Sequence, residues 1–194
     1  MNVKKLLLPV ILLSAAVLSI VTYTHNVMED LNRSLIRLHI IAESDSLYDQ
    51  QIKLAVRDEI LQAVKDISAR DTVLFTHTAE DAANSCLTRY GLPYSAHAEY
   101  GKFSFPRKSY KNITLPAGEY YGIRVVLGSG SGHNWWCVMY PPLCVSDDGN
   151  VYADEKTTAQ LKNTLHSDTY ELITKKNEET EIRFRVLEFI NSLK

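Results

Sequence analysis

The sequence lacks an excess of charge of either sign. Its 21 Lys and Arg residues and 23 Asp and Glu residues leave a formal net charge of −2 at pH 7. Domains that bind nucleic acid concentrate positive charge to meet the phosphates, so the composition does not indicate a nucleic-acid partner.

No internal repeat is found, which excludes solenoid and propeller architectures. A length of 194 residues with 45% hydrophobic content favours one domain with a packed core and appendages.

The sequence also has little that resembles a metal or cofactor motif. None of its six His residues belongs to an HExxH motif or to a pair with metal-binding spacing. His39 with Glu43 and Asp45 combines an imidazole with carboxylates, which is a ligand set for a divalent metal. A turn at a strand end followed by a helix cap explains the same residues and is the interpretation that we favour. We therefore predict neither a metal site nor a cofactor.

Cysteine is scarce, and the three residues are Cys86, Cys137 and Cys144. An odd number permits at most one disulfide within the chain. Cys137 and Cys144 are the local candidates, provided that Pro141 and Pro142 turn the chain until the two Cα atoms lie about 4.4–6.8 Å apart. Three reduced and buried thiols are the alternative, and the sequence leaves both open.

The N-terminal segment is far more apolar than the remainder. Lys4 and Lys5 precede an uncharged run from Leu6 to Val21, which is slightly shorter than the about 20 residues of a bilayer-spanning helix. Ser14-Ala15-Ala16 offers a small-residue site for signal peptidase. Residues 1–24 are therefore predicted to be a signal peptide or a membrane anchor. Basic residues stay on the cytoplasmic side, so under either alternative the rest of the chain is exported, secreted or membrane-anchored.

Hydrophobic periodicity predicts a single α+β domain over residues 34–194, preceded by a polar linker at residues 25–33. Apolar residues at i, i+3 and i+4 indicate amphipathic helices after Ser46 and from about residue 79 to residue 90, where Gly91 suits a helix C-terminus. Apolar runs and alternating patterns indicate strands. The predicted strands cover residues 34–42, 94–103, 112–115, 123–127 and 135–140.

The C-terminal part is predicted to have two segments. Residues 145–177 show no clean period, so we predict a mobile excursion there with a short helix near residues 157–165. A last helix from about residue 178 carries an apolar stripe that is expected to dock on the sheet. The stripe comprises Ile182, Val186, Phe189, Ile190 and Leu193. This order of elements indicates an antiparallel β-sheet packed against two or three helices.

The most distinctive stretch is GSGSGHNWWCVMYPPLC, from Gly128 to Cys144. Two apolar runs joined by a glycine-containing loop are typical of a β-hairpin. With a side-chain period of two, Trp136 lies on the same strand face as Val138, and Trp135 on the same face as Cys137. Neither face is polar. The strand is therefore expected to lie centrally in the sheet or to carry an apolar contact surface.

Cys137 is weighed as a catalytic nucleophile, because a thiolate beside an imidazole is the minimum for cysteine catalysis. His133 lies four residues earlier, which in a strand is a separation of more than about 10 Å. A productive base would have to be His39 or His97 from another strand. A core or disulfide cysteine is the interpretation that we favour.

Two further groups are candidates for binding. Lys53 and Arg57, one helical turn apart, could form with Arg37 and Arg124 a cationic patch for a carboxylate or an acidic loop; a solvated helix face is the alternative. Aromatic and proline residues of the kind that dominate protein–protein contacts gather around the hairpin. They are Tyr120, Tyr121, Trp135, Trp136, Tyr140, Pro141 and Pro142. If they fill the core instead, we expect one tryptophan buried and the other partly exposed.

Three blocks of the sequence resemble the stage II sporulation protein R family. Members of this family are secreted signalling proteins of endospore-forming bacteria. The first runs from Ile36 to Asp58 and contains IRLHIIAESDS, and the second runs from Phe105 to Tyr120 and contains LPAGEY. The third runs from Arg124 to Cys144 and contains NWWCV. The Arg183-Phe184-Arg185 helix adds to the resemblance.

The resemblance implies a signalling role. A protein of this family is made in the forespore and exported into the space between forespore and mother-cell membranes. There it triggers a membrane-embedded aspartic protease, which cleaves the inactive precursor of sigma-E. The cleavage chemistry belongs to the partner, so the resemblance implies no catalytic residue in this chain.

We expect the contact surface to combine the glycine-rich hairpin with the junction between the first strand and its helix. The predicted contact residues are Arg37, His39, Asp45, Arg57, Arg124, His133, Asn134, Trp135, Trp136 and Pro141. Two alternatives remain open. One is an exported cysteine hydrolase that acts on peptide or cell-wall material through Cys137, and the other is a structural protein of the intermembrane space with no signalling role.

Overall fold

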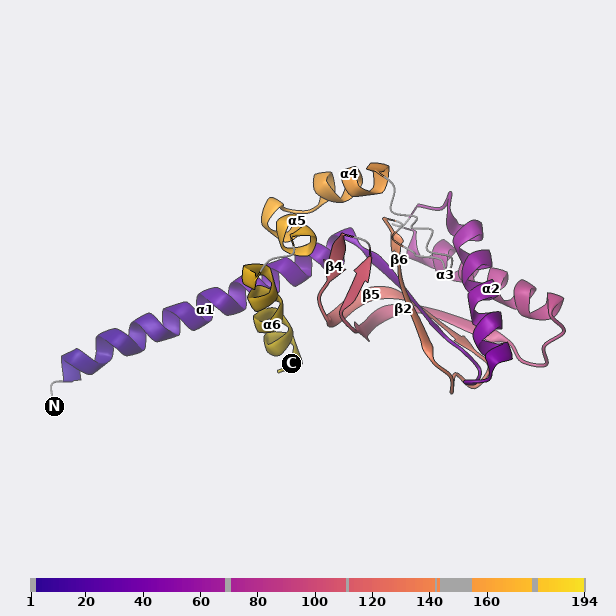
Figure 1. Ribbon diagram of the computed structural model, residues 1–194, viewed down its shortest axis with the longest axis horizontal. Helices are drawn as coiled ribbons and strands as arrows, with labels where there is room; N and C mark the ends of the chain where they lie inside the picture. Colours follow the sequence, from indigo (N-terminus) through magenta and orange to yellow (C-terminus); the bar gives the residue numbers. More distant parts are fainter. Residues whose placement is uncertain are drawn as a thin grey trace.

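The computed structural model describes residues 3–68, 71–110, 112–141, 143, 155–175 and 178–193. The helices are α1 (Val3–Ser34), α2 (Leu47–Val64), α3 (Thr72–Arg89), α4 (Glu155–Thr164), α5 (Ser167–Thr174) and α6 (Glu178–Ser192). The strands are β1 (Ile36–Ile41), β2 (Ala96–Phe105), β3 (Lys108–Tyr110), β4 (Ile113–Leu115), β5 (Gly118–Leu127) and β6 (Asn134–Tyr140). Figure 1 shows α1 projecting far from a domain that holds the other elements.

The α+β class is confirmed, and the sheet is mixed rather than wholly antiparallel. Four strands lie in the order β2-β5-β1-β6. The pairs β2–β5 and β1–β6 are antiparallel, whereas β1 and β5 are parallel. The parallel pair is possible because α2, α3 and β2 separate the two strands in the chain, long enough for the crossover that parallel strands require. Strands β3 and β4 form a separate two-stranded sheet.

The predicted hairpin between residues 123–127 and 135–140 is wrong, because β1 lies between β5 and β6. The six-residue loop Gly128–His133 spans two inter-strand spacings, about 10 Å. It does so by pairing with the residues that follow β1: the amide of Gly132 donates to the carbonyl of Ala42 over 2.9 Å, and that of Ser131 to Glu43 over 3.1 Å. A Cβ on Gly132 would collide with the Ser44 carbonyl, so this close approach requires glycine.

Helix α1 replaces the predicted linker at residues 25–33 with continuous helix. Within the described residues, Leu7–Ser34 is long and apolar enough to cross a membrane, with a mean hydropathy of 2.1 in its most apolar window, which suits a signal sequence as well as an anchor. The apolar side chains from Leu7 to Val21 are exposed, whereas Val27, Met28 and Leu31 are buried in the domain. These three residues lie on one face of the helix, but the polar residues around them obscured this pattern in the sequence. Burial against distant elements stabilises this helical turn.

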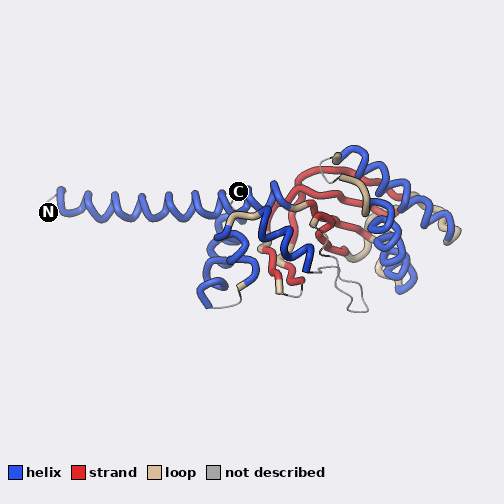
Figure 2. Tube along the Cα trace, turned by 90° about the horizontal axis from the view of Figure 1, so that it is seen from above, coloured by secondary structure: helices blue, strands red, loops and turns tan. Residues whose placement is uncertain are grey.

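The sheet has a core on each face. On one face, buried residues of α2 and α3 pack on Leu38, Ile40 and the alternate residues of β5 and β6; Figure 2 shows these two helices along one side of the sheet. We call this the helix-side core. The second core joins Phe105, Tyr120 and Val138 on the other face to the C-terminal half of α1 and to α4, α5, α6 and the β3–β4 pair.

The local signals for α2 and for the end of α3 are confirmed. The Ser46 hydroxyl accepts from the Asp49 amide over 3.1 Å and caps α2, and Gly91 follows α3 with a φ of 67°. Helix α3 begins earlier than predicted, at Thr72, because Asp71 caps it through the amide of Leu74 at 3.0 Å. The extra turns bury Phe75 in the helix-side core.

The C-terminal segment differs from the prediction in two ways. The short helix predicted near residues 157–165 is confirmed as α4, but α5 follows it, and the described part of the segment packs on the domain through Leu161, Leu165, Leu172 and Ile173 in the second core. Residues 145–154 of the predicted excursion lie outside the described part. Helix α6 docks through Phe184 and Leu187. The stripe that was expected to dock is instead turned outward, with Ile182, Val186, Phe189 and Leu193 exposed. Helix α6 carries two apolar stripes, and periodicity alone does not decide which one meets the core.

Candidate functional site

One row of side chains crosses all four strands of the sheet. The strand registers place Glu99 of β2 opposite Arg124 of β5, Arg124 opposite His39 of β1, and His39 opposite Trp136 of β6. All four side chains therefore point to the same face, the one that bears the second core. We call these four residues the central row. Three of them were predicted as contact residues, and the sheet brings them together.

His39 and Trp136 form the aromatic part of the central row. Their rings stack with centroids 3.8 Å apart and planes inclined by 19°. Phe105 meets the Trp136 ring edge-on, with centroids 4.9 Å apart. Since aromatic rings resist rotation when packed in this way, the row presents a preformed rather than an adaptable surface.

The surroundings of His39 disfavour its charged form. Burial lowers its pKa below the usual value; the hydrogen bond to Asn134 raises it, and the nearby guanidinium groups of Arg124 and Arg37 lower it. The Nε2 atom lies 2.7 Å from Oδ1 of Asn134. An amide oxygen only accepts, so Nε2 carries the ring proton and donates. Nδ1 is then a bare acceptor, and it has no hydrogen-bond partner among the described residues.

Arg124 and Glu99 form the more exposed part of the central row. The Arg124 Nε donates to Oε1 of Glu99 over 2.8 Å, and the guanidinium lies 4.5 Å from the ring centroid of Phe103. Both charged side chains are partly exposed. An exposed ion pair contributes little to stability, typically below about 1 kcal/mol, so its arrangement suits contact with a partner better than fold stabilisation. Sequence analysis missed Glu99 and Phe103, whose strand alternation was visible but whose pairing with β5 was not.

The loop Gly128–His133 lies against the turn between β1 and α2, beside the central row, and we call the two together the junction. Oδ1 of Asp45 accepts from the His133 amide over 2.6 Å, and the two side chains also form an ion pair. The Lys53 ammonium donates to the His133 carbonyl over 3.0 Å, and the Ser129 amide donates to Glu43. These contacts fix the loop Gly128–His133 on the turn after β1 and leave Asp45, His133 and Asn134 exposed.

The predicted cationic patch is not formed. Arg37 is fully buried between the rings of Phe105 and Tyr120, with its guanidinium carbon 4.1 and 4.6 Å from their centroids. Arg57 is buried on the opposite face, 4.6 Å from the Trp135 ring, and its Nε donates to Asp58 over 2.9 Å. The four cations are thus distributed over both faces because α2 covers one face while Arg37 and Arg124 point to the other. Arg37 and Arg57 are not available as contact residues.

The two tryptophans are both half-buried, one on each face of β6, whereas one was predicted to be buried and the other partly exposed. Trp135 packs against the helix-side core and Trp136 against the second core. Pro141 is buried and Tyr140 is exposed. The exposed predicted contact residues are therefore Asp45, His133 and Asn134, with Arg124 and the two indoles partly accessible.

The arrangement of Cys137 does not support the cysteine hydrolase. Cys137 is disulfide-bonded, Cys86 is free and buried, and Cys144 lies outside the described residues. The Cys137 side chain belongs to the helix-side core, whereas His39 points to the opposite face. His97 is exposed on β2, where its Nδ1 lies 3.0 Å from Glu80. A disulfide sulfur is not a thiolate, and neither predicted base lies beside it.

The residues weighed as metal ligands are engaged with other groups. His39 bonds to Asn134, Glu43 to the loop amide of Ser129, and Asp45 to His133. In the part of the chain that the structure describes, no group of three or more His, Cys, Asp or Glu side chains has a geometry that would hold a metal ion.

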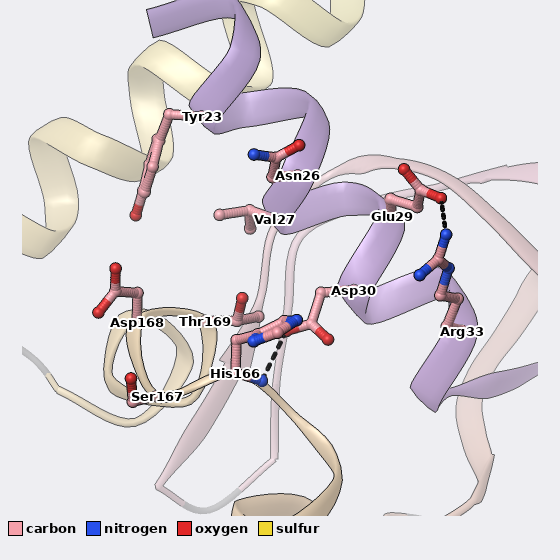
Figure 3. Close-up of a pocket in the computed structure, with 10 residues that line it drawn as sticks. All are labelled: Tyr23, Asn26, Val27, Glu29, Asp30, Arg33, His166, Ser167, Asp168 and Thr169. Carbon is pink, nitrogen blue, oxygen red and sulfur yellow. Dashed lines mark hydrogen bonds and ion pairs between the residues drawn. The ribbon is translucent and has the colours of Figure 1, made fainter. Parts of the chain in front are cut away.

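A cavity of about 380 Å³ lies away from these residues, between α1 and the start of α5. Figure 3 shows Tyr23 of α1 pointing across it toward Asp168 of α5, while Glu29 is turned toward Arg33. Two of its charged groups are engaged elsewhere: Oδ2 of Asp30 accepts from the His166 amide over 2.9 Å and so joins α1 to the start of α5, and Arg33 pairs with Glu29 within α1. We therefore place the candidate site at the central row and the junction.

The fold and the site together define a structural class: a small α+β domain that follows an apolar N-terminal helix and presents a preformed aromatic and polar surface. Comparison with known proteins gives the family. The family model for stage II sporulation protein R matches residues 32–150. The stage II sporulation protein R of Bacillus subtilis (strain 168) is 37% identical over 180 residues, covering 81% of this chain and 80% of that protein.

The chain therefore belongs to the stage II sporulation protein R family, and its association with sporulation follows from that membership. The matched range contains the whole sheet, the central row and the junction. No solved structure matches the chain.

Proposed function

We propose that this protein is an exported sporulation signal that activates a membrane-embedded aspartic protease, which then cleaves the sigma-E precursor in the mother cell. Family membership carries the proposal. The apolar helix at the N-terminus supports export, as a signal sequence or as an anchor. The site of action is the space between the forespore and mother-cell membranes.

The character of the candidate site supports recognition rather than bond cleavage by this chain. The central row is held by ring stacking and by the Arg124–Glu99 pair, so little side-chain freedom is lost when a partner binds. The junction adds exposed polar groups at Asp45, His133 and Asn134. A half-buried aromatic centre with a polar rim is the usual anatomy of a protein interface.

Activation requires a preference for one state of the protease. A ligand that binds active and inactive conformations equally shifts nothing, however tight the binding. The surface must therefore complement an outward loop of the protease, or its dimer, in the active arrangement. A rigid surface suits this task because it does not adapt to the inactive arrangement.

The proposal is tested by producing the full chain together with the protease and the sigma-E precursor in a host that does not sporulate. The ratio of cleaved to uncleaved precursor is measured by immunoblot. The unsubstituted chain is expected to raise the cleaved fraction. His133→Ala is expected to lower the response by about tenfold, the effect of losing an interface residue of moderate importance.

His97→Ala is the matched control. His97 and His133 have side chains that are each 76% exposed, and each pairs with a carboxylate, but His97 lies on the opposite edge strand of the sheet. The control is expected to signal normally. If the unsubstituted chain causes no additional cleavage, the proposal is wrong, and a structural role in the intermembrane space gains support. Equal losses for both histidine variants would move the contact surface away from the junction.

A further inference from the structure

Helix α6 exposes a second apolar stripe that the fold does not use. Ile182, Val186, Phe189 and Leu193 are separated by four, three and four positions, which places them on one side of a helix with about 3.6 residues per turn. All four side chains are exposed. On the same geometry, this side lies opposite Phe184 and Leu187, which are buried in the second core. The stripe therefore faces away from the domain.

The position of α6 along α1 shows which surroundings the stripe would meet. The uncharged run Leu6–Val21 is about 24 Å long as a helix and so fills most of a hydrocarbon layer of about 30 Å. Tyr23 comes two residues later. The Arg183 guanidinium of α6 lies 5.6 Å from the centroid of the Tyr23 ring. Tyrosine and arginine side chains gather at the membrane–water boundary, so this contact places α6 at that level.

The orientation of α6 suits the same surroundings. In Figures 1 and 2 α6 runs crosswise to the direction in which α1 projects, at the end of the domain from which α1 leaves. If α1 crosses the bilayer, α6 lies in the plane of its surface. The stripe then points toward the lipid, with Arg183 and Arg185 on its two flanks. Both cations are paired within the helix, Arg183 with Glu179 and Arg185 with Glu181, so the apolar stripe itself carries the similarity to a helix that lies in the membrane interface.

We infer that α6 is an interfacial membrane helix, which lays its Ile182–Leu193 stripe on the lipid surface next to the point where α1 emerges. The helix fixes the tilt of the domain above the bilayer, because its other stripe is locked into the second core and Arg107 bonds to both Glu181 and Glu188 of α6. The junction comes directly before α2, which Figure 1 shows at the end of the domain away from α6. If α1 is cleaved after export, α6 remains as a weak and reversible membrane contact.

The inference rests on the proposed export of the domain to a membrane surface, but not on activation of a protease. The test uses the full chain, inserted through α1 into vesicles of phosphatidylcholine and phosphatidylglycerol. Phe189→Trp places an indole in the stripe, and brominated acyl chains of the phosphatidylcholine quench it when it enters the lipid. Trp135 and Trp136 give a background that is measured with the unsubstituted chain.

Val73→Trp is the matched control. Val73 on α3 is 67% exposed and Phe189 is 63% exposed, but α3 packs on the helix-side core, on the face of the sheet opposite to the core that holds α6. Quenching of Phe189→Trp is expected to be at least about twofold stronger than that of Val73→Trp, since an interfacial helix buries its apolar face about 5–10 Å into the lipid. Adding Ile182→Ser and Leu193→Ser to Phe189→Trp is expected to reduce the quenching to the control value.

Equal quenching of the two positions overturns the inference. Quenching that is absent while chemical crosslinking joins two copies through α6 assigns the stripe to a second copy of the chain instead. The precursor-cleavage assay separates this inference from the proposed function. If cleavage occurs without lipid contact, only the role of α6 fails. If lipid contact occurs without cleavage, only the signalling role fails.

Discussion

The two faces of the sheet are buried by different parts of the chain. The helix-side core is formed by α2 and α3, which follow β1 directly in the chain and are followed by β2 of the same sheet. The second core is formed by α1 and by α4 to α6, which come from the two ends of the chain. One face is therefore closed by local sequence, and the other by segments that meet only when the whole chain has folded.

The two faces also differ in polarity. The described residues of the helix-side core are apolar side chains and two cysteines. The opposite face buries Arg37 and His39 and leaves the Arg124–Glu99 pair partly exposed. Buried polar groups cost stability unless their hydrogen bonds are satisfied. The comparison indicates that the helix-side core stabilises the domain while the opposite face gives up some stability to hold the recognition surface.

Two phenylalanines give the largest expected effect and test this division directly. Phe75 in the helix-side core is 3% exposed and Phe105 in the second core is 1% exposed. Phe75→Ala and Phe105→Ala are each expected to lower the free energy of unfolding by about 3–5 kcal/mol, because both leave a large cavity. Chemical denaturation of the purified chain measures this.

The two variants are expected to differ in signalling. The Phe105 ring packs against the Trp136 ring, and its centroid lies 6.1 Å from that of the His39 ring. Removing the Phe105 ring is therefore expected to loosen the central row. Phe75 touches none of these groups. At a temperature where both variants remain folded, Phe105→Ala is expected to give markedly less precursor cleavage than Phe75→Ala. Equal activities at equal stability would contradict the division of the sheet into a stabilising and a recognising face.

Arg37 gives the second prediction. Its guanidinium donates to the Tyr110 hydroxyl over 3.3 Å, while Nε and Nη1 have no hydrogen-bond partner in the described part of the chain. Replacing a buried charge by an apolar side chain of similar volume is often neutral or stabilising. Arg37→Met is therefore expected to leave the free energy of unfolding unchanged or to raise it by about 1 kcal/mol. Arg37→Ala is expected to lower it by about 2–3 kcal/mol through the cavity.

Denaturant titration measures the change in the free energy of unfolding for Arg37→Met and for Arg37→Ala, and so shows whether the two changes have the same sign. A large loss of stability in Arg37→Met would mean that the charge itself stabilises the second face, and the comparison between the faces would then have to be revised. Leu38→Met, at the neighbouring position of β1 that faces the helix-side core, is the control for placing methionine in a packed strand, and is expected to cost less than about 1.5 kcal/mol.

The difference between the faces also explains what sequence reasoning was able to predict. The stripe of α2, the Ser46 cap and the glycine after α3 depend on neighbours within one helical turn, and these predictions were confirmed. The parallel pairing of β1 with β5 depends on residues more than eighty positions apart. A glycine-rich loop between two apolar runs looks the same whether the strands pair directly or enclose a third.

The candidate site was predictable to the extent that it consists of strand ends. Asp45 follows β1 and His133 precedes β6, and both motifs were distinctive, so their meeting was expected and is observed. Arg57 was misplaced because α2 buries it beside Trp135, and no local signal separates a buried helix cation from a solvated one. Glu99 was missed because only the register of β2 on β5 brings it to Arg124.

His39 gives the smallest expected effect, which depends on pH. Burial keeps its pKa in the folded chain below the value of about 6.5 expected in the unfolded chain. Between these two pKa values the unfolded chain binds a proton that the folded chain does not, so acidification favours unfolding. The contribution is fully present above about pH 6.5, diminishes as the pH falls below that value, and becomes constant below the folded pKa.

Denaturant titrations between pH 5 and pH 8 measure this dependence, and His39→Gln is expected to flatten it because the variant has no imidazole to titrate. His97→Gln is the control for replacing a histidine of the same sheet, since the His97 side chain is exposed whereas His39 is buried. The helix-side core contains no histidine among its described residues, so a slope that persists in His39→Gln would have to arise elsewhere. That outcome would show that His39 is not the group that makes the recognising face more sensitive to acid than the stabilising face.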